Sequence, residues 1–182
     1  MRVKPKRIVK MTILGEITPE TLRQFVHGTA PDGEDGFLKN DKPGVRIEIT
    51  LSSPGGDIDV GMAIYELIRT AAAKVAIVGY GIVGSIAVLI FMAAKERILS
   101  AGTRLFLHPG TIMSDIPENI FTMRAKSQEL MILHKWYTDQ ISSRAFTDPA
   151  AIADLCDKDT FMDAQEAKRL GIATWILLYT DR

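Results

Sequence analysis

The stretch VAIVGYGIVGSIAVLIFMAA, residues 75–94, carries no charge over twenty positions and supports three interpretations. Its centre, GYGIVG at 79–84, matches the G-x-G-x-x-G pattern of a dinucleotide-binding turn between a strand and a helix. Its length would also allow an apolar helix to cross a bilayer. The third interpretation is a buried strand that turns tightly through its glycines into a buried helix, with Ser85 at the joint. The rest of the chain decides among the three.

The neighbouring segments argue against a nucleotide cofactor. A dinucleotide-binding fold needs an acidic residue at the end of the next strand, about twenty positions further on. The next strand-like segments, ERILS and TRLFLH, end in Ser100 and His108 instead. Two strands also precede the glycines, whereas the fingerprint belongs to the first strand of its domain. We therefore expect no bound cofactor.

A membrane span is disfavoured as well. Three glycines and Tyr80 interrupt the apolar run, and the chain lacks the loop-charge asymmetry and aromatic belts of spanning proteins. A strand and a helix that follow one another, each too short to cross a bilayer, produce the same hydropathy. We expect both to be buried in a globular core.

Composition narrows the function classes further. The 182 residues include 22 basic and 22 acidic side chains, so no basic excess points to nucleic acid or a membrane surface. The length fits a single domain, residues 1–182. One cysteine, Cys156, cannot form an internal disulfide, which favours a reducing, cytoplasmic setting. Its acidic neighbours disfavour a reactive thiolate, and the basic N-terminus lacks the apolar region of a secretory signal.

Hydrophobic periodicity and capping residues predict alternating strands and helices. We expect strands at 8–14, 45–51, 74–78, 97–99, 104–108 and 173–178. Helices are expected at 19–27, 57–73, 85–94, 117–144, from about 149 onward and after Asp163, and residues 29–44 read as a polar loop. This alternation is typical of an α/β fold with a largely parallel sheet.

Ser85 is a candidate nucleophile. It lies at the first turn of an apolar helix, where the helix N-terminus favours developing negative charge. The backbone N–H of Ile86 is a candidate donor to an oxyanion. The alternative is that Ser85 serves only as the N-cap of the helix.

A nucleophilic serine needs a base, and the chain has three histidines. His27 ends the first helix, where an imidazolium suits the dipole, and His134 lies on an apolar stripe that suits packing or a subunit contact. His108 follows a strand, at the carboxyl edge where open α/β sheets hold ligands, so it is the preferred base. Candidate orienting carboxylates cluster near the C-terminus, and the pattern leaves the choice open among Asp154, Asp157 and Asp159, since Asp163 is expected to cap a helix.

Four segments resemble the proteolytic subunit of the Clp protease. They are SSPGGDIDVGMAIYELI (52–68), GYGIVGSIAVLIFMAA (79–94), RLFLHPG (104–110) and DKDTFMDAQEAKRLGIAT (157–174). They occur in the order and at the spacing of that family, and the resemblance as a whole extends over residues 8–178. The resemblance implies the ClpP/crotonase-like fold, with repeated βαβ units, strands on two roughly perpendicular surfaces and a long protruding helix.

The resemblance also implies the site. Ser85 takes the place of the nucleophile, His108 of the base and Asp159 of the orienting acid, while the N–H groups of Gly56 and Ile86 form the oxyanion hole. It implies a serine endopeptidase acting on unfolded polypeptides or peptides, with no metal or organic cofactor. The implied partners are further copies in a homo-oligomeric ring, a heptamer or a stacked tetradecamer, and an AAA+ unfoldase.

Departures from the family pattern concern assembly more than chemistry. Ile86 replaces the usual methionine, and Pro109-Gly110 replaces the usual Gln-Pro after the histidine. Residues 109–119 lack the glycine-rich handle pattern, and the short N-terminus suggests altered axial loops. Three rivals stay open: a catalytically silent Clp-like scaffold, a crotonase-type acyl-CoA hydratase or isomerase on the same fold, and a Ser–Lys peptidase using Lys95 or Lys126.

Overall fold

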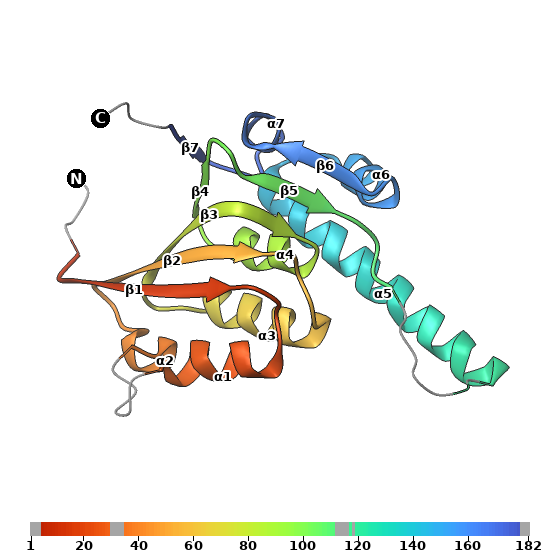
Figure 1. Cartoon of the computed structure of the whole chain (residues 1–182), viewed down its shortest axis with the longest axis horizontal. Coiled ribbons are helices and arrows are strands. Elements are labelled where there is room, and N and C mark those ends of the chain that lie inside the picture. Colours follow the sequence, from red (N-terminus) through yellow and green to blue (C-terminus); the bar gives the residue numbers. More distant parts are fainter. Residues whose placement is uncertain (1–4, 30–34, 112–116, 118, 179–182) are drawn as a thin grey trace.

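A computed structural model shows a parallel-dominated sheet covered by helices, with one long helix extending away from it (Figure 1). The structure describes residues 5–29, 35–111, 117 and 119–178. The strands are β1 (Arg7–Leu14), β2 (Val45–Ser53), β3 (Lys74–Gly84), β4 (Glu96–Ser100), β5 (Arg104–Leu107), β6 (Thr160–Asp163) and β7 (Trp175–Leu177). The helices are α1 (Pro19–His27), α2 (Phe37–Asn40), α3 (Ile58–Arg69), α4 (Ile86–Ala93), α5 (Ile120–Ala145), α6 (Pro149–Asp157) and α7 (Ala164–Arg169).

The central strand β3 divides its partners between two directions. The sheet runs β1-β2-β3-β4-β7, and all four of these pairings are parallel. The first half of β3 pairs with β4 from Ala76 to Gly79, whereas the last three residues, from Ile82 to Gly84, pair with β5. Gly81, with φ +63°, lies between these two segments. Strand β5 therefore lies beside the carboxyl end of β3, and β6 pairs with β5 in antiparallel orientation.

Residues 75–94 therefore form a strand and a helix, as expected. The tight turn expected at the glycines of 79–84 is wrong. GYGIVG continues β3 to Gly84 because each of its halves finds a different neighbouring strand. The chain turns only at Ser85. Every residue of α4 is buried, so the uniform hydropathy of this segment reflects a helix enclosed on all sides. No helix in the described part of the chain is long and apolar enough to cross a membrane.

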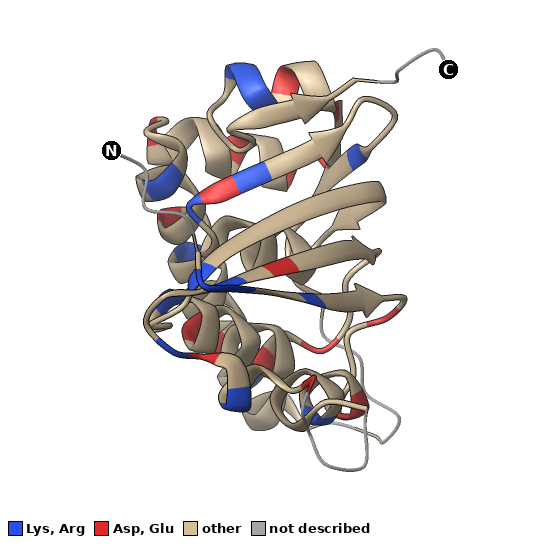
Figure 2. Cartoon of the chain, turned by 90° about the vertical axis from the view of Figure 1, so that its left-hand side faces the viewer, with Lys and Arg blue, Asp and Glu red and all other residues tan. Residues whose placement is uncertain are grey.

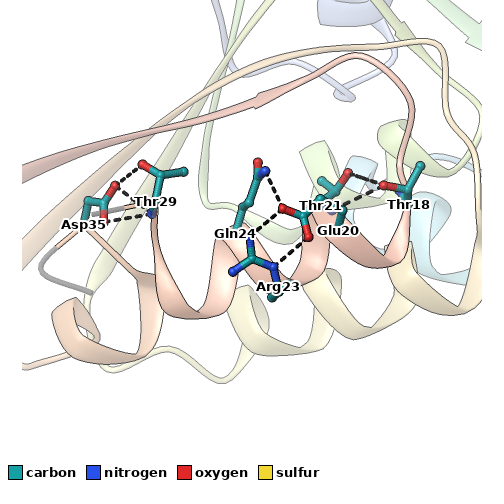
Figure 3. Close-up of polar contacts among 7 residues, drawn as sticks. All are labelled: Thr18, Glu20, Thr21, Arg23, Gln24, Thr29 and Asp35. Carbon is teal, nitrogen blue, oxygen red and sulfur yellow. Dashed lines mark hydrogen bonds and ion pairs between the residues drawn. The ribbon is translucent and has the colours of Figure 1, made fainter. Parts of the chain in front are cut away.

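Capping residues begin the helices where the sequence predicts. Thr18 caps α1 and, with Thr21, forms a reciprocal pair of backbone and side-chain hydrogen bonds (Figure 3). On the same exposed face Glu20 accepts hydrogen bonds from Arg23 and Gln24. Asp57 caps α3, Asp148 caps α6 and Asp163 caps α7 through the N–H of the third helical residue or its neighbour.

Two arginines close the carboxyl end of α4. Arg97, which is 6% exposed, donates to four backbone carbonyls, those of Ala94, Arg144, Gly171 and Ile172. Arg144 of α5 donates to the carbonyls of Met92, Ala93 and Ala94. Burial, and to a lesser degree the neighbouring Arg144, lowers the pKa of Arg97 to about 10. The carbonyls of Met92, Ala93 and Ala94 are among those that the end of α4 leaves without intrahelical partners.

Several element boundaries differ from the sequence prediction. The expected loop at 29–44 contains α2, whose Phe37 stacks on Phe25 of α1 with ring centroids 4.6 Å apart. Strand β6 was not predicted. Helix α5 begins at Ile120, capped by Asn119, rather than at Pro117. Part of the expected change in segment 109–119 lies at residues 112–116 and 118, outside the described residues, and the expectation about axial loops falls in part on residues 1–4, which are also outside them.

The charged residues are dispersed over helices and strands (Figure 2). Arg46 of β2 is an example, because it forms ion pairs with both Glu48 and Glu96 at 2.8 Å. This arrangement agrees with the balanced charge of the sequence.

Candidate active site

Ser85 occupies the joint between β3 and α4 in an unusual backbone conformation. Its φ of 53° and ψ of −130° lie in a region that non-glycine residues rarely adopt. It stands at the N-cap position of α4, yet its side chain makes no capping hydrogen bond. Among the described residues, the Oγ of Ser85 has no hydrogen-bond partner at all. The hydroxyl is therefore not used to begin the helix.

Three hydrogen bonds hold the Ser85 backbone in place. Its N–H donates to the carbonyl of Phe106 in β5 at 2.8 Å. Its carbonyl accepts from the hydroxyl of Tyr137 in α5 at 2.9 Å, and also from the N–H of Val88 at 2.9 Å. The strained residue is thus supported from the sheet on one side and from α5 on the other.

Gly55 leaves the space that Ser85 fills. A Cβ atom added to Gly55 would lie 2.5 Å from the Cβ of Ser85 and 3.1 Å from its Oγ, and the φ of Gly55 is +114°. Only glycine fits there, on both steric and conformational grounds. The family resemblance pointed to Gly56 of the SPGG segment, but the sequence gave no sign that Gly55 packs on Ser85.

His108 lies beside Ser85 because β5 pairs with the end of β3. Gly84 is in register with Phe106. His108 follows two residues later, directly after the end of β5, and so lies at the same carboxyl edge. Its ring stacks on Phe106 with centroids 4.8 Å apart, and Phe106 stacks on Phe161 of β6 at 4.1 Å. An open groove of about 740 Å³ is lined by Ser85, His108 and Gly56 together. Three of the five residues expected at the site therefore share one groove.

Asp159 lies immediately before β6 and next to His108 in register. Leu107 pairs with Thr160 in the antiparallel β5–β6 ladder, so one further step would bring His108 opposite Asp159. Asp159 has a positive φ of 50° and an exposed side chain. No hydrogen bond in the described part of the chain joins Ser85, His108 and Asp159 to one another. The structure therefore brings Ser85 and His108 into one groove and leaves Asp159 adjacent but unjoined.

The other candidate carboxylates are engaged elsewhere. Asp154 forms an ion pair with Lys158 at 2.7 Å, and an oxygen of the Asp157 carboxylate lies 3.4 Å from Nε2 of His134 in α5. Asp163 accepts the N–H of Glu166 at 2.8 Å as the cap of α7. Within the described residues, Asp159 is the one of the four whose side chain has no hydrogen-bond or ion-pair partner. This distinction was not available from the sequence.

The two candidate oxyanion donors lie near Ser85 in different places, because Gly56 lines the groove and Ile86 lines a second cavity with Ser85 and His108. Ile17 bonds to the carbonyl of Gly55 and the N–H of Asp57, at 2.8 and 2.9 Å, in an isolated parallel bridge with Gly56. This bridge uses the neighbours of Gly56, so the N–H of Gly56 itself is directed away from Ile17. Ile86 is the first residue of α4, where N–H groups have no carbonyl partner inside the helix.

The remaining candidates lie as follows. Lys126 of α5 lines the same groove as Ser85, whereas Lys95 follows the carboxyl end of α4, about 12 Å of helix away from Ser85. His134, expected to suit packing or a subunit contact, lies 3.4 Å from the carboxylate of Asp157, and the hydroxyl of Tyr137 donates to the carbonyl of Ser85. Cys156 is fully buried, and burial with the nearby Asp157 raises its pKa to about 12. Among the described residues, no group of three or more His, Cys, Asp or Glu side chains could hold a metal ion.

Comparison with known proteins agrees with this architecture. A family model described as Clp protease matches residues 36–179. The ATP-dependent Clp protease proteolytic subunit 2 of Borreliella burgdorferi is 32% identical over 164 residues, which are 89% of this chain and 79% of that protein. The ATP-dependent Clp protease proteolytic subunit 1 of Chlamydia abortus is 26% identical over 143 residues, 78% of this chain and 74% of that protein.

A solved structure gives the fold directly. A ClpP1 mutant from Listeria monocytogenes matches with a TM-score of 0.78 at 22% identity, over 94% of this chain and 92% of that one. The branched parallel sheet and this likeness define the fold of a ClpP-type peptidase. The chain belongs to the Clp protease family, and identities of 26% and 32% to the relatives named above make it a divergent member.

Proposed function

We propose that this chain is a serine endopeptidase that cleaves unfolded proteins or peptides through Ser85, His108 and Asp159. The observation that carries the proposal is the state of Ser85. It stands at an N-cap position in a strained conformation, yet its Oγ does not cap the helix and instead lines a groove with His108. A serine that only began α4 would gain stability by bonding the first helical N–H groups.

In the proposed reaction, His108 accepts the proton of Ser85 Oγ as this oxygen attacks the substrate carbonyl carbon. The carbonyl oxygen becomes an oxyanion and accepts hydrogen bonds from the N–H groups of Gly56 and Ile86. His108 then donates its proton to the leaving amine, and an acyl-enzyme ester remains on Ser85. Water, deprotonated by His108, hydrolyses the ester and restores the serine.

Asp159 completes the triad in this proposal by accepting the second N–H of the His108 ring, which fixes the tautomer and stabilises the imidazolium. The β5–β6 register supports this role, as does the finding that Asp159 has no competing side-chain partner among the described residues. Catalytic hydrogen bonds are often long before substrate binds. The lack of a hydrogen bond between His108 and Asp159 in this structure is therefore compatible with its formation in the substrate complex.

The proposal extends to assembly. We infer one peptidase domain per chain, working in the cytoplasm inside a homo-oligomeric ring, a heptamer or a stacked tetradecamer, with an AAA+ unfoldase as partner. Exposed apolar side chains on α5 support a protein contact there, since Phe121 is 80% exposed and Ile132 is 71% exposed. A ring would also keep the groove away from folded proteins of the cell.

The test is hydrolysis of a fluorogenic peptide by the wild type, Ser85→Ala and Ser143→Ala. Ser143 is exposed on α5, and within the described residues its hydroxyl bonds only to the carbonyl of Gln140, so it controls for the loss of a serine hydroxyl. We expect Ser85→Ala to lower kcat by about 10³-fold or more and Ser143→Ala to leave it unchanged. A folded Ser85→Ala protein with full turnover would refute the proposal.

Further activity measurements on the same protein and its variants separate the rival functions. A scaffold subunit would fold and assemble but show no hydrolysis even as the wild type. A hydratase would convert an enoyl-CoA thioester and would not need Ser85. A Ser–Lys peptidase would keep its activity in His108→Ala and lose it in Lys126→Met, since Lys126 shares the groove.

A further inference from the structure

The hydrogen bond from Tyr137 to the carbonyl of Ser85 reaches into the proposed catalytic machinery from a different element. The hydroxyl of Tyr137, on α5, lies 2.9 Å from this carbonyl oxygen. The second acceptor site of the same oxygen is taken by the N–H of Val88 at 2.9 Å. The carbonyl of the strained residue is therefore fixed in direction by two donors.

The direction of this carbonyl determines the direction of the Ile86 N–H. Both groups belong to the peptide unit between Ser85 and Ile86, which is planar, and in a trans peptide the C=O and the N–H point to opposite sides. A donor that holds the carbonyl towards α5 therefore aims the N–H of Ile86 away from α5. A donor at the carbonyl also polarises the peptide unit and strengthens its N–H as a hydrogen-bond donor.

Tyr137 is well supported in this role. The neighbouring Trp136 packs edge-on against the ring of Tyr65 of α3 with ring centroids 5.7 Å apart, and this ring contact fixes that part of α5 against the helix layer. Burial raises the pKa of Tyr137 well above its usual value, so its phenol keeps its proton and donates throughout the working pH range.

We propose that Tyr137 is a positioning residue, which orients the Ser85–Ile86 peptide so that the Ile86 N–H can bind the oxyanion formed during acyl transfer. This inference rests on the proposed function. Tyr137 acts through the peptide and does not itself touch the reacting atoms. The sequence did not suggest this role, because Tyr137 continues the apolar stripe of α5 through Leu130 and Ile141 and reads there as a packing residue.

Replacement by phenylalanine tests the inference, because Tyr137→Phe removes one oxygen and keeps the ring. Tyr65→Phe is the matched control, since it also removes a phenol hydroxyl that bonds between elements and keeps the ring, but the acceptor of that hydroxyl is Gln140 of α5 rather than Ser85. We expect Tyr137→Phe to lower kcat about tenfold with little change in KM, because a direct oxyanion donor is worth about 10²- to 10³-fold and an indirect one less. Tyr65→Phe should leave kcat unchanged.

A second measurement excludes a merely structural effect. A peptide boronate forms a tetrahedral adduct with a serine and occupies the oxyanion site, whereas the corresponding peptide carboxylate binds only as a product. Tyr137→Phe should weaken the boronate about tenfold and leave the carboxylate unchanged. Equal kcat and equal boronate affinity in Tyr137→Phe and the wild type would overturn the inference, as would parallel weakening of both ligands. If Ser85→Ala retains hydrolysis, the proposed function itself fails; if only the Tyr137 effect is missing, that function stands.

Discussion

Leu107 and Thr160 form the last residue pair between β5 and β6, one step short of His108 and Asp159. Antiparallel partners at this step point to the same face of the ladder. The stacked rings of Phe106 and Phe161, two residues before His108 and two after Asp159, already share that face at 4.1 Å. The strand pairing therefore places His108 and Asp159, more than fifty residues apart in sequence, each one residue beyond the last pair of the same ladder.

This register predicts that Asp159→Asn will lower kcat at least 10²-fold while folding and assembly persist. Asparagine keeps the size of the side chain but removes the charge that stabilises the His108 imidazolium. Peptide hydrolysis and size-exclusion chromatography measure the two properties. Asp157→Asn is the control, because Asp157 pairs with His134 rather than facing the β5–β6 ladder. Full turnover in Asp159→Asn together with a loss in Asp157→Asn would reassign the orienting carboxylate to Asp157.

The contact between Gly55 and Ser85 predicts that Gly55→Ala will abolish turnover. The added Cβ would lie 2.5 Å from that of Ser85, so the serine must shift. Gly15→Ala is a matched control, because Gly15 also has a positive φ, +78°, but no atom lies within 4 Å of an added Cβ. We expect Gly15→Ala to lower the melting temperature slightly, through backbone strain of about 1 kcal/mol, and to keep its kcat. Normal hydrolysis by Gly55→Ala would show that Ser85 is not held against Gly55 in the active state.

The buried arginine pair predicts a large effect on stability away from the groove. Arg97→Ala removes the side-chain donor of the Arg144, Gly171 and Ile172 carbonyls, while the Ala94 carbonyl keeps Arg144, and should cost about 3 kcal/mol or more. For a chain of this length, the melting temperature should fall by on the order of 10 °C. Arg104→Ala, at an exposed arginine of β5, should change it by about 2 °C or less. Similar melting temperatures for the two variants would contradict the role assigned to Arg97.

The raised pKa of Cys156, about 12, predicts an inert thiol in the native protein. At pH 8 almost none of this side chain is thiolate, and it is also fully buried. Iodoacetamide should label Cys156 only after guanidinium unfolds the chain, as intact mass spectrometry would show. Stoichiometric labelling of the native protein within minutes would mean that α6 opens readily or that the thiol is accessible.

Much of the fold could be predicted from local patterns. Cap residues such as Thr18, Asp57 and Asp163 begin their helices as expected because capping is a local hydrogen-bonding effect. The glycines of 79–84 misled the prediction, because their role depends on two other strands that pair with the two halves of β3. The four-residue strand β6 is too short to show a periodic pattern and exists through its pairing with β5.

The residues of the candidate site also differ in whether local sequence patterns could identify them. Ser85 and His108 could be recognised from their positions at a helix start and a strand end. Asp159 was distinguished from its neighbours only by the family resemblance, and in the structure by the partners that Asp154, Asp157 and Asp163 have. Gly55 and Tyr137 could not be identified, because each acts through a contact with Ser85 from a segment distant in sequence.

The central claim is that Ser85 is a nucleophile activated by His108, and a fluorophosphonate probe tests it most directly. The probe should form one covalent adduct per chain, and peptide mapping by mass spectrometry should place it on Ser85. The adduct should be absent in Ser85→Ala and strongly reduced in His108→Ala, while Ser143→Ala labels like the wild type. Absence of any adduct in folded wild-type protein, or an adduct on another serine, would contradict the account.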